Sequence, residues 1–280
     1  MASGDETAPP SVWLQDLTWE EVASYLRHDA VAIIPVGAVE QHGPAGPLGV
    51  DSYVAIMIAE DVARRTGTLC TPPIWFGDSL HHLGFPGTVA LRPQTLTLVL
   101  QDVCRSLVRH GFTRIVLVNG NKGSNMPAMI TAVRTLHEEE APNAVFVVAD
   151  PLNLAKHTAG SIKGTSEHHA GELELSQVMY RYPGLVRTDR VTDAHVDFDR
   201  VFGGFVGSDL FGPAPEGVEI MWSGQEERAM TPTGSFSSSI GISSEKGRVY
   251  HEHLVQRLSE VVEWLRTYTG PIGAVEVTSR

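Results

Sequence analysis

The chain has 280 residues, of which 42% are hydrophobic, and a formal net charge of −12 at pH 7. This length and apolar content are sufficient for a large domain with a buried core. The acidic balance and the absence of a Lys/Arg cluster argue against nucleic acid as a partner, because binding to phosphate backbones depends on clustered basic residues. No apolar stretch approaches the ~20 residues that a membrane helix requires, so we expect no membrane partner.

The amino-terminal segment and the two cysteines indicate the cellular compartment. The amino-terminal segment lacks the basic end and the apolar stretch of a secretory signal, and Cys70 and Cys104 are typical of buried free thiols rather than of a disulfide framework. We therefore expect a cytoplasmic protein. Residues 1–10 are predicted to be a disordered lead-in, and residues 11–280 a single domain.

Predicted strands and helices alternate along the chain. Short apolar runs predict strands, and segments with a 3.6-residue apolar period predict helices. In chain order the elements are a helix over Ser11–His28, a strand over Val31–Val36, a helix over Asp51–Thr66, a strand over Cys70–Trp75, a helix over Pro93–His110, a strand over Arg114–Val118, a helix over Met126–Glu140, a strand over Ala144–Ala149, a helix over Gly171–Tyr180 and a helix over Tyr250–Thr269. This alternation predicts a three-layer α/β/α fold with a mostly parallel sheet. Residues 184–249 have no clear assignment.

Three side chains that can bind a metal follow the first predicted strand. Glu40, His42 and Asp51 lie in a loop rich in Gly and Pro, directly after Val31–Val36. Open α/β sheets bind their ligands at the carboxyl ends of strands, and Glu, His and Asp are common donors to zinc or manganese. The alternative is a polar loop with incidental charges, because a Glu-x-His triplet by itself is common.

The surrounding residues form a longer pattern. Residues 40–51 read E-Q-H-G-P-x-x-P-L-x-x-D, and three further blocks follow in order: SLHHLGFPGT (79–88), VLVNGNKGSN (116–125) and HAGELELS (169–176). With these blocks the chain resembles the creatininase family of metal-dependent amidohydrolases. The resemblance covers residues 31–176 and is looser over the last hundred residues.

The resemblance implies two metal positions that share one carboxylate. Glu40, Asp51 and residue 121 would hold one ion, and His42, Asp51 and Glu172 the other, so that Asp51 bridges them. Position 121 departs from the family pattern N-G-H, because it is Asn121, whose amide oxygen is a weaker zinc ligand than imidazole. We therefore expect one tight Zn²⁺, with a second divalent ion, Mn²⁺ or Zn²⁺, bound weakly or not at all.

Lys122 is a second departure from the family pattern. If the first metal is lost or weak, Lys122 would stand in for its charge. If Asn121 instead ligates a harder ion, Lys122 would hold a substrate oxyanion or carboxylate, which would make it a catalytic and substrate-binding residue. The third alternative is that Lys122 is a solvent-exposed lysine of the loop without a functional role.

The HAGELELS block supplies the residue for proton transfer. The resemblance implies that His169 is the general acid/base; the alternative is that it only orients Glu172. We expect His168 to have a supporting or substrate-facing role. Glu174 is two residues from Glu172, so on a helix the two carboxylates point to different faces, and we expect Glu174 to support the site rather than bind metal.

These expectations define a function. The resemblance implies a hydrolase that cleaves a cyclic or linear amide of a small polar molecule with metal-activated water, and substrate contacts from Ser79 and His82. One alternative keeps the metal site and cleaves a C–C bond of a cyclic β-diketone such as a dehydro-inosose. Another is a metal-binding member without catalytic activity. The resemblance also implies a homo-oligomer, which in proteins of this type is often a hexamer.

Overall fold

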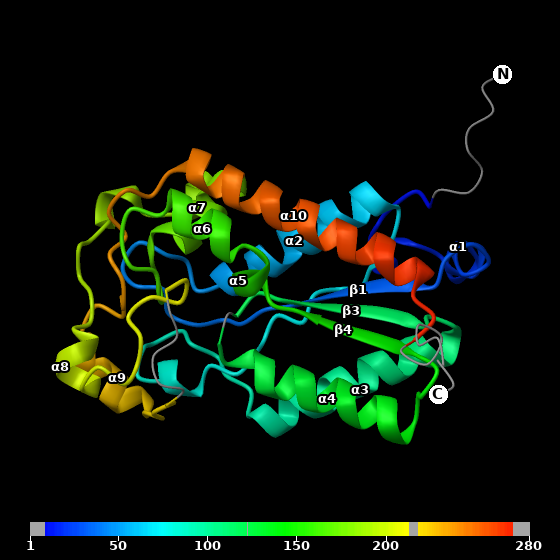
Figure 1. Cartoon of the computed structure of the whole chain (residues 1–280), viewed down its shortest axis with the longest axis horizontal. Helices are drawn as coiled ribbons and strands as arrows, with labels where there is room; N and C mark the ends of the chain where they lie inside the picture. The colour runs from blue at the N-terminus through cyan, green and yellow to red at the C-terminus, as the bar shows by residue number, and fades with distance from the viewer. Residues whose placement is uncertain (1–8, 122, 213–217, 271–280) are drawn as a thin grey trace, which may run out of the picture.

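The computed structural model describes residues 9–121, 123–212 and 218–270. Most of the predicted lead-in, residues 1–10, and Lys122 therefore lie outside the described residues. The described chain forms three layers, with a sheet between two groups of helices (Figure 1). This is the predicted α/β/α arrangement.

The sheet has four parallel strands in the order β2-β1-β3-β4. The strands are β1 (Val31–Val36), β2 (Leu69–Cys70), β3 (Arg114–Asn119) and β4 (Val145–Ala149). β1 pairs with β3 along its whole length, from Val31 opposite Arg114 to Val36 opposite Asn119. Every residue of β1 is buried, as expected for a parallel strand covered on both faces. The predicted strand over Cys70–Trp75 is much shorter, because after Cys70 only an isolated bridge between Val36 and Ile74 remains.

The helices cover the two faces of the sheet with separate apolar clusters. Val31, Ile33 and Val116 face one cluster, whereas Ala32, Ile34 and Ile115 face the other, as the alternation along a strand requires. On the first face lie α2 (Val50–Thr66), α5 (Pro151–Leu154), α6 (Lys156–Ile162), α7 (Glu172–Arg181) and α10 (Ser244–Thr267). On the second lie α1 (Trp19–Tyr25), α3 (Pro93–His110) and α4 (Asn125–Glu139).

Helix ends follow their local signals. Thr18 caps α1 as half of a capping box with Glu21, so the predicted helix over Ser11–His28 is in fact a single turn of 3-10 helix, Leu14–Asp16, followed by the seven residues of α1. α3 ends at Gly111, whose φ of 106° is in the left-handed region that glycine adopts most easily. The last helix begins at Ser244, earlier than predicted, where Ser243 caps its first turn.

The segment that the sequence left unassigned forms a small structure of its own beyond the strand ends. It contains the 3-10 turns Pro183–Leu185 and Thr188–Arg190, α8 (Phe198–Phe202) and α9 (Gly224–Met230). Val196, Phe198, Phe202 and Phe236 form a third apolar cluster there. Figure 1 shows α8 and α9 at one end of the molecule, opposite α1. Since α1 leads directly into β1, this is the end at which the carboxyl ends of the strands lie.

The two cysteines and the lengths of the helices bear on two further expectations. Cys70 and Cys104 are free and buried, as predicted, and burial raises the pKa of both thiols. Among the described residues, none of the helices has the length and apolar character needed to cross a bilayer.

Candidate metal centre and active site

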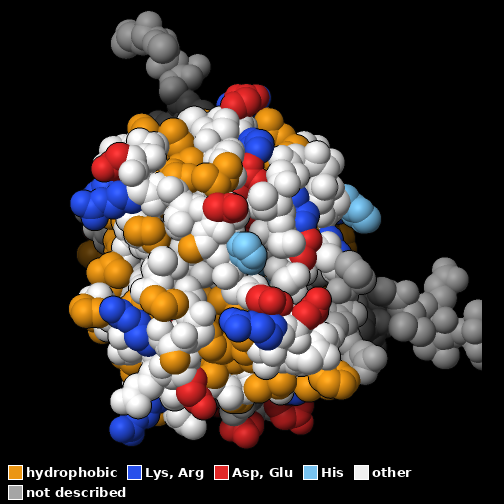
Figure 2. Space-filling view, turned by 90° about the vertical axis from the view of Figure 1, so that its left-hand side faces the viewer, with side chains coloured by type: hydrophobic (Ala, Val, Ile, Leu, Met, Phe, Trp, Pro, Cys, Tyr) orange, Lys and Arg blue, Asp and Glu red, His pale blue; other side chains and the backbone are white. Residues whose placement is uncertain are grey.

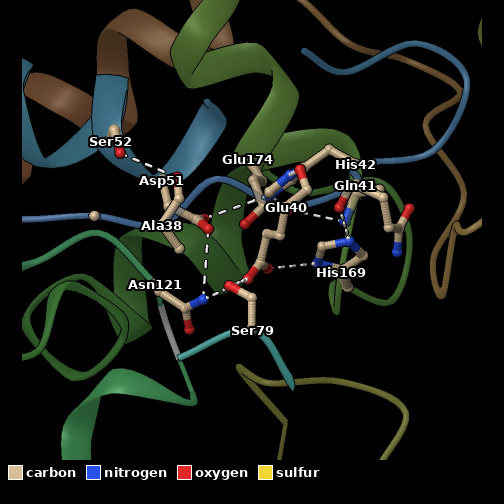
Figure 3. A network of polar contacts seen from close by, with 12 residues as sticks. Ala38, Glu40, Gln41, His42, Asp51, Ser52, Ser79, Asn121, His169 and Glu174 are labelled. Carbon is tan, nitrogen blue, oxygen red and sulfur yellow. Dashed lines mark hydrogen bonds and ion pairs between the residues drawn. The ribbon is translucent and has the colours of Figure 1, made fainter. Parts of the chain in front are cut away.

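Polar side chains gather where the parallel strands end. Glu40 and His42 lie in the loop after β1, which is folded back by a hydrogen bond from the Glu40 amide to the Leu48 carbonyl (2.9 Å). Asp51 is the second residue of α2, and Asn121 follows β3. The four polar residues are each at most 5% exposed. Figure 3 shows their side chains directed toward one point, where the loops after β1 and β3 meet the start of α2.

His42 presents an unpartnered nitrogen to this point. Its Nδ1–H donates to the backbone carbonyl of Glu40 (3.1 Å), so Nε2 is the nitrogen that can offer a lone pair to a cation. This Nε2 is buried and makes no hydrogen bond of good geometry within the described chain. It lies 3.4 Å from Asp51 Oδ1 and 3.7 Å from Glu174 Oε2. A lone pair that faces two carboxylate oxygens is repelled by them unless positive charge lies between.

A divalent cation fits this position. Ligand atoms bound at ~2.0–2.2 Å to one tetrahedral zinc lie about 3.3–3.6 Å from one another, close to the two separations measured from His42. Burial lowers the pKa of His42, but Asp51 and then Glu174 raise it further, to about 9, so these carboxylates favour positive charge at Nε2, as a proton in the metal-free protein or as a cation that replaces it. Burial and the neighbouring Glu40 raise the pKa of Asp51 to about 7, a sign of crowded negative charge that a cation would relieve.

The structure places Glu174 at this point instead of Glu172. Glu174 Oε2 faces His42 and accepts a hydrogen bond from the amide of Ala170 (2.8 Å). Glu172 instead accepts from the amide of Gly164 (2.6 Å) and pairs with Lys246 of α10. The structure therefore does not bring Glu172, the expected ligand, to His42, and brings Glu174, for which a supporting role was expected, to this place instead. Residues two apart on a helix are about 200° apart, so only one of the two can face the site.

Two local features fix the start of α7. Ala170 has a φ of 58°, in the left-handed region that residues other than glycine rarely adopt, and turns the chain between His169 and the helix. The buried Glu167 carboxylate accepts from the amides of Leu173 and Glu174, both at 3.0 Å. A carboxylate at this place satisfies free amides of the first helical turn and complements the helix dipole. Sequence reasoning missed Glu167, which lies ahead of the recognised block.

His169 faces the same point from the other side. Its Nε2–H donates to the backbone carbonyl of Gln41 (2.6 Å), so Nδ1 carries the lone pair and lies 3.7 Å from Glu40 Oε1. Burial, and then the nearby His82 and His42, hold the pKa of His169 well below its usual value. The ring is therefore neutral at neutral pH, as a proton acceptor must be.

Glu40 is the centre of a second set of contacts. Its Oε2 accepts from Ser79 Oγ (2.5 Å), and its Oε1 lies 3.1 Å from His82 Nε2. Burial opposes ionisation, but His82, His42 and Ser79 lower the pKa of Glu40 to about 2. Ser79 and His82, predicted to contact substrate, are thus held by the Glu40 carboxylate.

A carboxylate that no sequence motif indicated lies behind His82. Glu227, on α9, is fully buried and accepts from His82 Nδ1 (2.6 Å), Gln41 Nε2 (3.2 Å) and Trp222 Nε1 (3.2 Å). Burial by itself would lower the pKa of His82, but the carboxylates of Glu40 and Glu227 on its two sides raise it to about 10. The capping box of α9 predicts a helix but gives no sign that Glu227 points into the site.

A small cavity opens beside these groups, with a volume of about 100 Å³. One wall is aromatic, since Trp222 stacks on Phe236 at 6.0 Å and His168 stacks on Phe236 at 5.4 Å. His168, expected in a supporting or substrate-facing role, therefore belongs to the wall. Six of the polar residues described above also line the cavity: Glu40, Asp51, His82, Asn121, His169 and Glu174.

Comparison with known proteins connects this geometry to a family. The family described as "Creatinine amidohydrolase" matches residues 15–262. A creatinine amidohydrolase of Pseudomonas putida is 32% identical over 269 residues, which are 90% of this chain and 96% of that protein. A 3-dehydro-scyllo-inosose hydrolase of Thermotoga maritima is 36% identical over 192 residues, 66% of this chain and 61% of that one. A mycofactocin precursor peptide peptidase of Mycolicibacterium smegmatis is 34% identical over 167 residues, 58% of this chain and 62% of that one.

Solved structures agree with the sequence match. A structure described as "Creatininase Mn" superposes with a TM-score of 0.76 at 29% identity, covering 92% of this chain and all of that one. Another, a mutant creatininase described as "Zn-Zn type", has a TM-score of 0.74 at 29% identity and covers 92% of this chain and 99% of that one. Since the family match spans most of the sequence and the fold is shared, this chain belongs to the creatininase family of hydrolases.

Proposed function

We propose that the chain is a metal-dependent hydrolase of a small cyclic amide, with a divalent ion held by His42, Asp51 and Glu174. The observation that carries this proposal is the buried Nε2 of His42, which faces two carboxylate oxygens and makes no hydrogen bond of good geometry within the described chain. When bound, such an ion would polarise a carbonyl and make water more acidic. Relatives in manganese and zinc forms support a divalent ion.

His169 is placed to move the proton in this reaction. His169 lines the cavity, and its Nδ1 carries the lone pair because Nε2–H is held by the Gln41 carbonyl. Nδ1 would accept a proton from the water that attacks the amide carbon, and return it to the nitrogen as the C–N bond breaks. The hydrogen bond to a backbone carbonyl keeps the ring in the tautomer that this task requires.

The cavity favours a small, flat substrate. Its volume of about 100 Å³ is well below the ~300–1,000 Å³ of pockets for drug-sized ligands. The stacked wall of Trp222 and Phe236 suits a planar ring, which can lie against an aromatic face. These features support a cyclic amide over a peptide. A cyclic β-diketone has a similar size and remains the alternative, supported by the inosose hydrolase relative.

The test is a comparison of substrates on the zinc- or manganese-loaded protein. Creatinine, a 3-dehydro-inosose and a short peptide would represent the three relatives, with product formation measured by mass spectrometry. We expect turnover of a cyclic amide that a chelator abolishes and added metal restores. A His169→Gln variant should lose about 10²–10⁴-fold in rate while it keeps its metal. A loaded protein that is inert on all three classes would support the non-catalytic alternative.

We also propose that the chain is a homo-oligomer. Six of the large exposed apolar side chains come from the segment 48–89: Leu48, Trp75, Phe76, Leu80, Leu83 and Val89. Figure 2, which views the end where α8 and α9 lie, shows several groups of apolar side chains among the charged ones. Sedimentation equilibrium would measure the assembly, and a monomer at micromolar concentration would contradict this proposal.

A further inference from the structure

The Glu40 carboxylate is surrounded by hydrogen-bond donors from this chain. Its Oε2 accepts from Ser79 Oγ at 2.5 Å and from Asn121 Nδ2 at 2.8 Å. Its Oε1 lies 3.1 Å from His82 Nε2. Glu40 is only 3% exposed, so these contacts replace water around the charge. The negative charge of Glu40 is thus already compensated by the protein.

The orientation of the Asn121 amide is fixed by its other contacts. Its Oδ1 accepts from the backbone amides of Gly123 (3.3 Å) and Ser124 (3.0 Å), at the start of α4. A flipped amide would place NH₂ against two backbone N–H groups, so both hydrogen bonds would be replaced by donor–donor contacts. Asn121 therefore presents hydrogens, not a lone pair, to Glu40 at 2.8 Å and to Asp51 at 3.5 Å.

The His82 ring is equally unsuited to bind a cation. Its Nδ1 lies 2.6 Å from Glu227 and its Nε2 lies 3.1 Å from Glu40, so each nitrogen faces a carboxylate oxygen. An ionised carboxylate can only accept, so the ring donates from both nitrogens. His42 contrasts with this arrangement, because its free Nε2 faces Asp51 and Glu174.

We propose that the hydrogen-bond donors around Glu40 take the place of a second metal ion, so that the protein binds a single divalent ion at His42, Asp51 and Glu174. Glu40 is then a positioning residue that holds Ser79, His82 and Asn121 in place, and not a ligand of the bound ion. This inference rests on the proposed function, since it assumes the ion at His42. It separates this chain from the relative whose structure is described as a "Zn-Zn type".

The test counts metal ions in the full-length protein. Each variant is loaded with excess zinc, dialysed against a weak chelator and analysed by inductively coupled plasma mass spectrometry. We expect one equivalent in the unmodified protein and one in Glu40→Gln, because Glu40 is not a ligand. We expect almost none in His42→Ala. Two equivalents in the unmodified protein, or loss of the ion in Glu40→Gln, would overturn the single-ion proposal.

Replacing the NH₂ group of Asn121 tests why a second ion is excluded. Asn121→Asp keeps the shape but replaces the NH₂ that faces Glu40 and Asp51 by a carboxylate oxygen. The carboxylates of Glu40 and Asp51 then meet a third carboxylate instead of an NH₂ donor, so we expect about two equivalents of zinc. Asn143→Asp is the matched control: Asn143 is exposed before β4, at the other end of the sheet, and this variant should keep one equivalent.

A spectroscopic measurement and a second variant complete the experiment. Loaded with Mn²⁺, the unmodified protein should give the electron paramagnetic resonance signal of an isolated ion, and Asn121→Asp that of a coupled pair. If Asn121→Asp does not fold, Asn121→His supplies a nitrogen ligand at the same place and should also bind a second ion. If the Asn121 variants that fold still bind one equivalent of metal, the NH₂ group of Asn121 is not what excludes the second ion, and this part of the proposal is overturned. An unmodified protein that binds no zinc would instead refute the proposed function.

Discussion

Two glutamates in the first turn of α7 allow a matched comparison of metal binding and stability. Glu172 and Glu174 are both buried, at 1% and 4% exposed, but they face different partners. Glu174 faces His42, whereas Glu172 pairs with Lys246. The same isosteric substitution, Glu→Gln, at each position should therefore separate the two roles.

The magnitudes follow from the contacts. In Glu174→Gln, an amide oxygen can keep the hydrogen bond from Ala170, but one negative charge beside the ion is lost. Changes just outside a metal shell weaken binding about 10–100-fold, so loss of a ligand charge should cost at least tenfold, or about 1.4 kcal/mol. Glu172→Gln breaks a buried ion pair. The full cost of about 3–5 kcal/mol is reduced here to roughly 1–3, because Lys246 remains 32% exposed to water.

Two assays report the two effects independently. Competition with a chromophoric chelator gives the zinc affinity, and urea unfolding of the metal-free protein gives its free energy of unfolding. We expect Glu174→Gln to lose affinity with little loss of metal-free stability, and Glu172→Gln to lose stability with unchanged affinity. The opposite pattern, with the metal lost only in Glu172→Gln, would refute the placement of α7 described above.

Three further predictions follow from other contacts. Removal of the proposed ion from the zinc-loaded protein should lower the unfolding temperature, because an ion at 100 times its dissociation constant stabilises the native state by about 2.7 kcal/mol. Calorimetry with and without a chelator tests this, and equal temperatures would contradict it. Glu227→Ala removes the buried partner of His82, whereas Gln41 Nε2 keeps its hydrogen bond to the Gly234 carbonyl and Trp222 is partly exposed. Breaking this buried pair should lower the free energy of unfolding by about 3–5 kcal/mol in urea titrations, with Glu227→Gln losing less. Partial burial raises the pKa of Asp61, but hydrogen bonds from His251 and Arg181 outweigh it and hold that pKa below its usual value. This stabilisation is present above the unfolded pKa of about 3.9 and is lost as the pH falls through the lower folded pKa, so Asp61→Asn should cost stability at neutral pH and progressively less in acid; a difference that grows on acidification would be the opposite result.

Much of the fold could be predicted because its signals are local. The apolar run Val31–Val36 has the predicted bounds, and so does the helix Pro93–His110, which ends at Gly111. Short motifs such as the capping box of Thr18 act within a few residues, so they can be recognised without knowledge of the fold. The parallel topology follows from the alternation of strands and helices.

The site could be predicted only where its residues follow a strand directly. Glu40, His42 and Asp51 meet as expected, because the loop after β1 positions all three. The choice between Glu172 and Glu174 depended on which face of α7 packs inward, and this is decided by contacts with distant segments such as Lys246. Asn121 lies at the site as expected. Its NH₂ group faces Glu40, however, whereas a metal ligand would present its amide oxygen. Glu227 was missed, because its position is set by packing of α9 against the distant 3-10 turn Leu80–His82, which no local pattern reports.

The contacts that complete the site join segments far apart in the chain, and this has a consequence for folding. Gln41 donates to Glu227 and to the carbonyl of Gly234, 186 and 193 residues away, and His169 returns 128 residues to the Gln41 carbonyl. Contacts of such sequence separation form late, because the entropy of closing long loops must be overcome first. A chain still being synthesised, or trapped as an intermediate, can contain His42, Asp51 and His169 while Gln41 still lacks its partners Glu227 and Gly234.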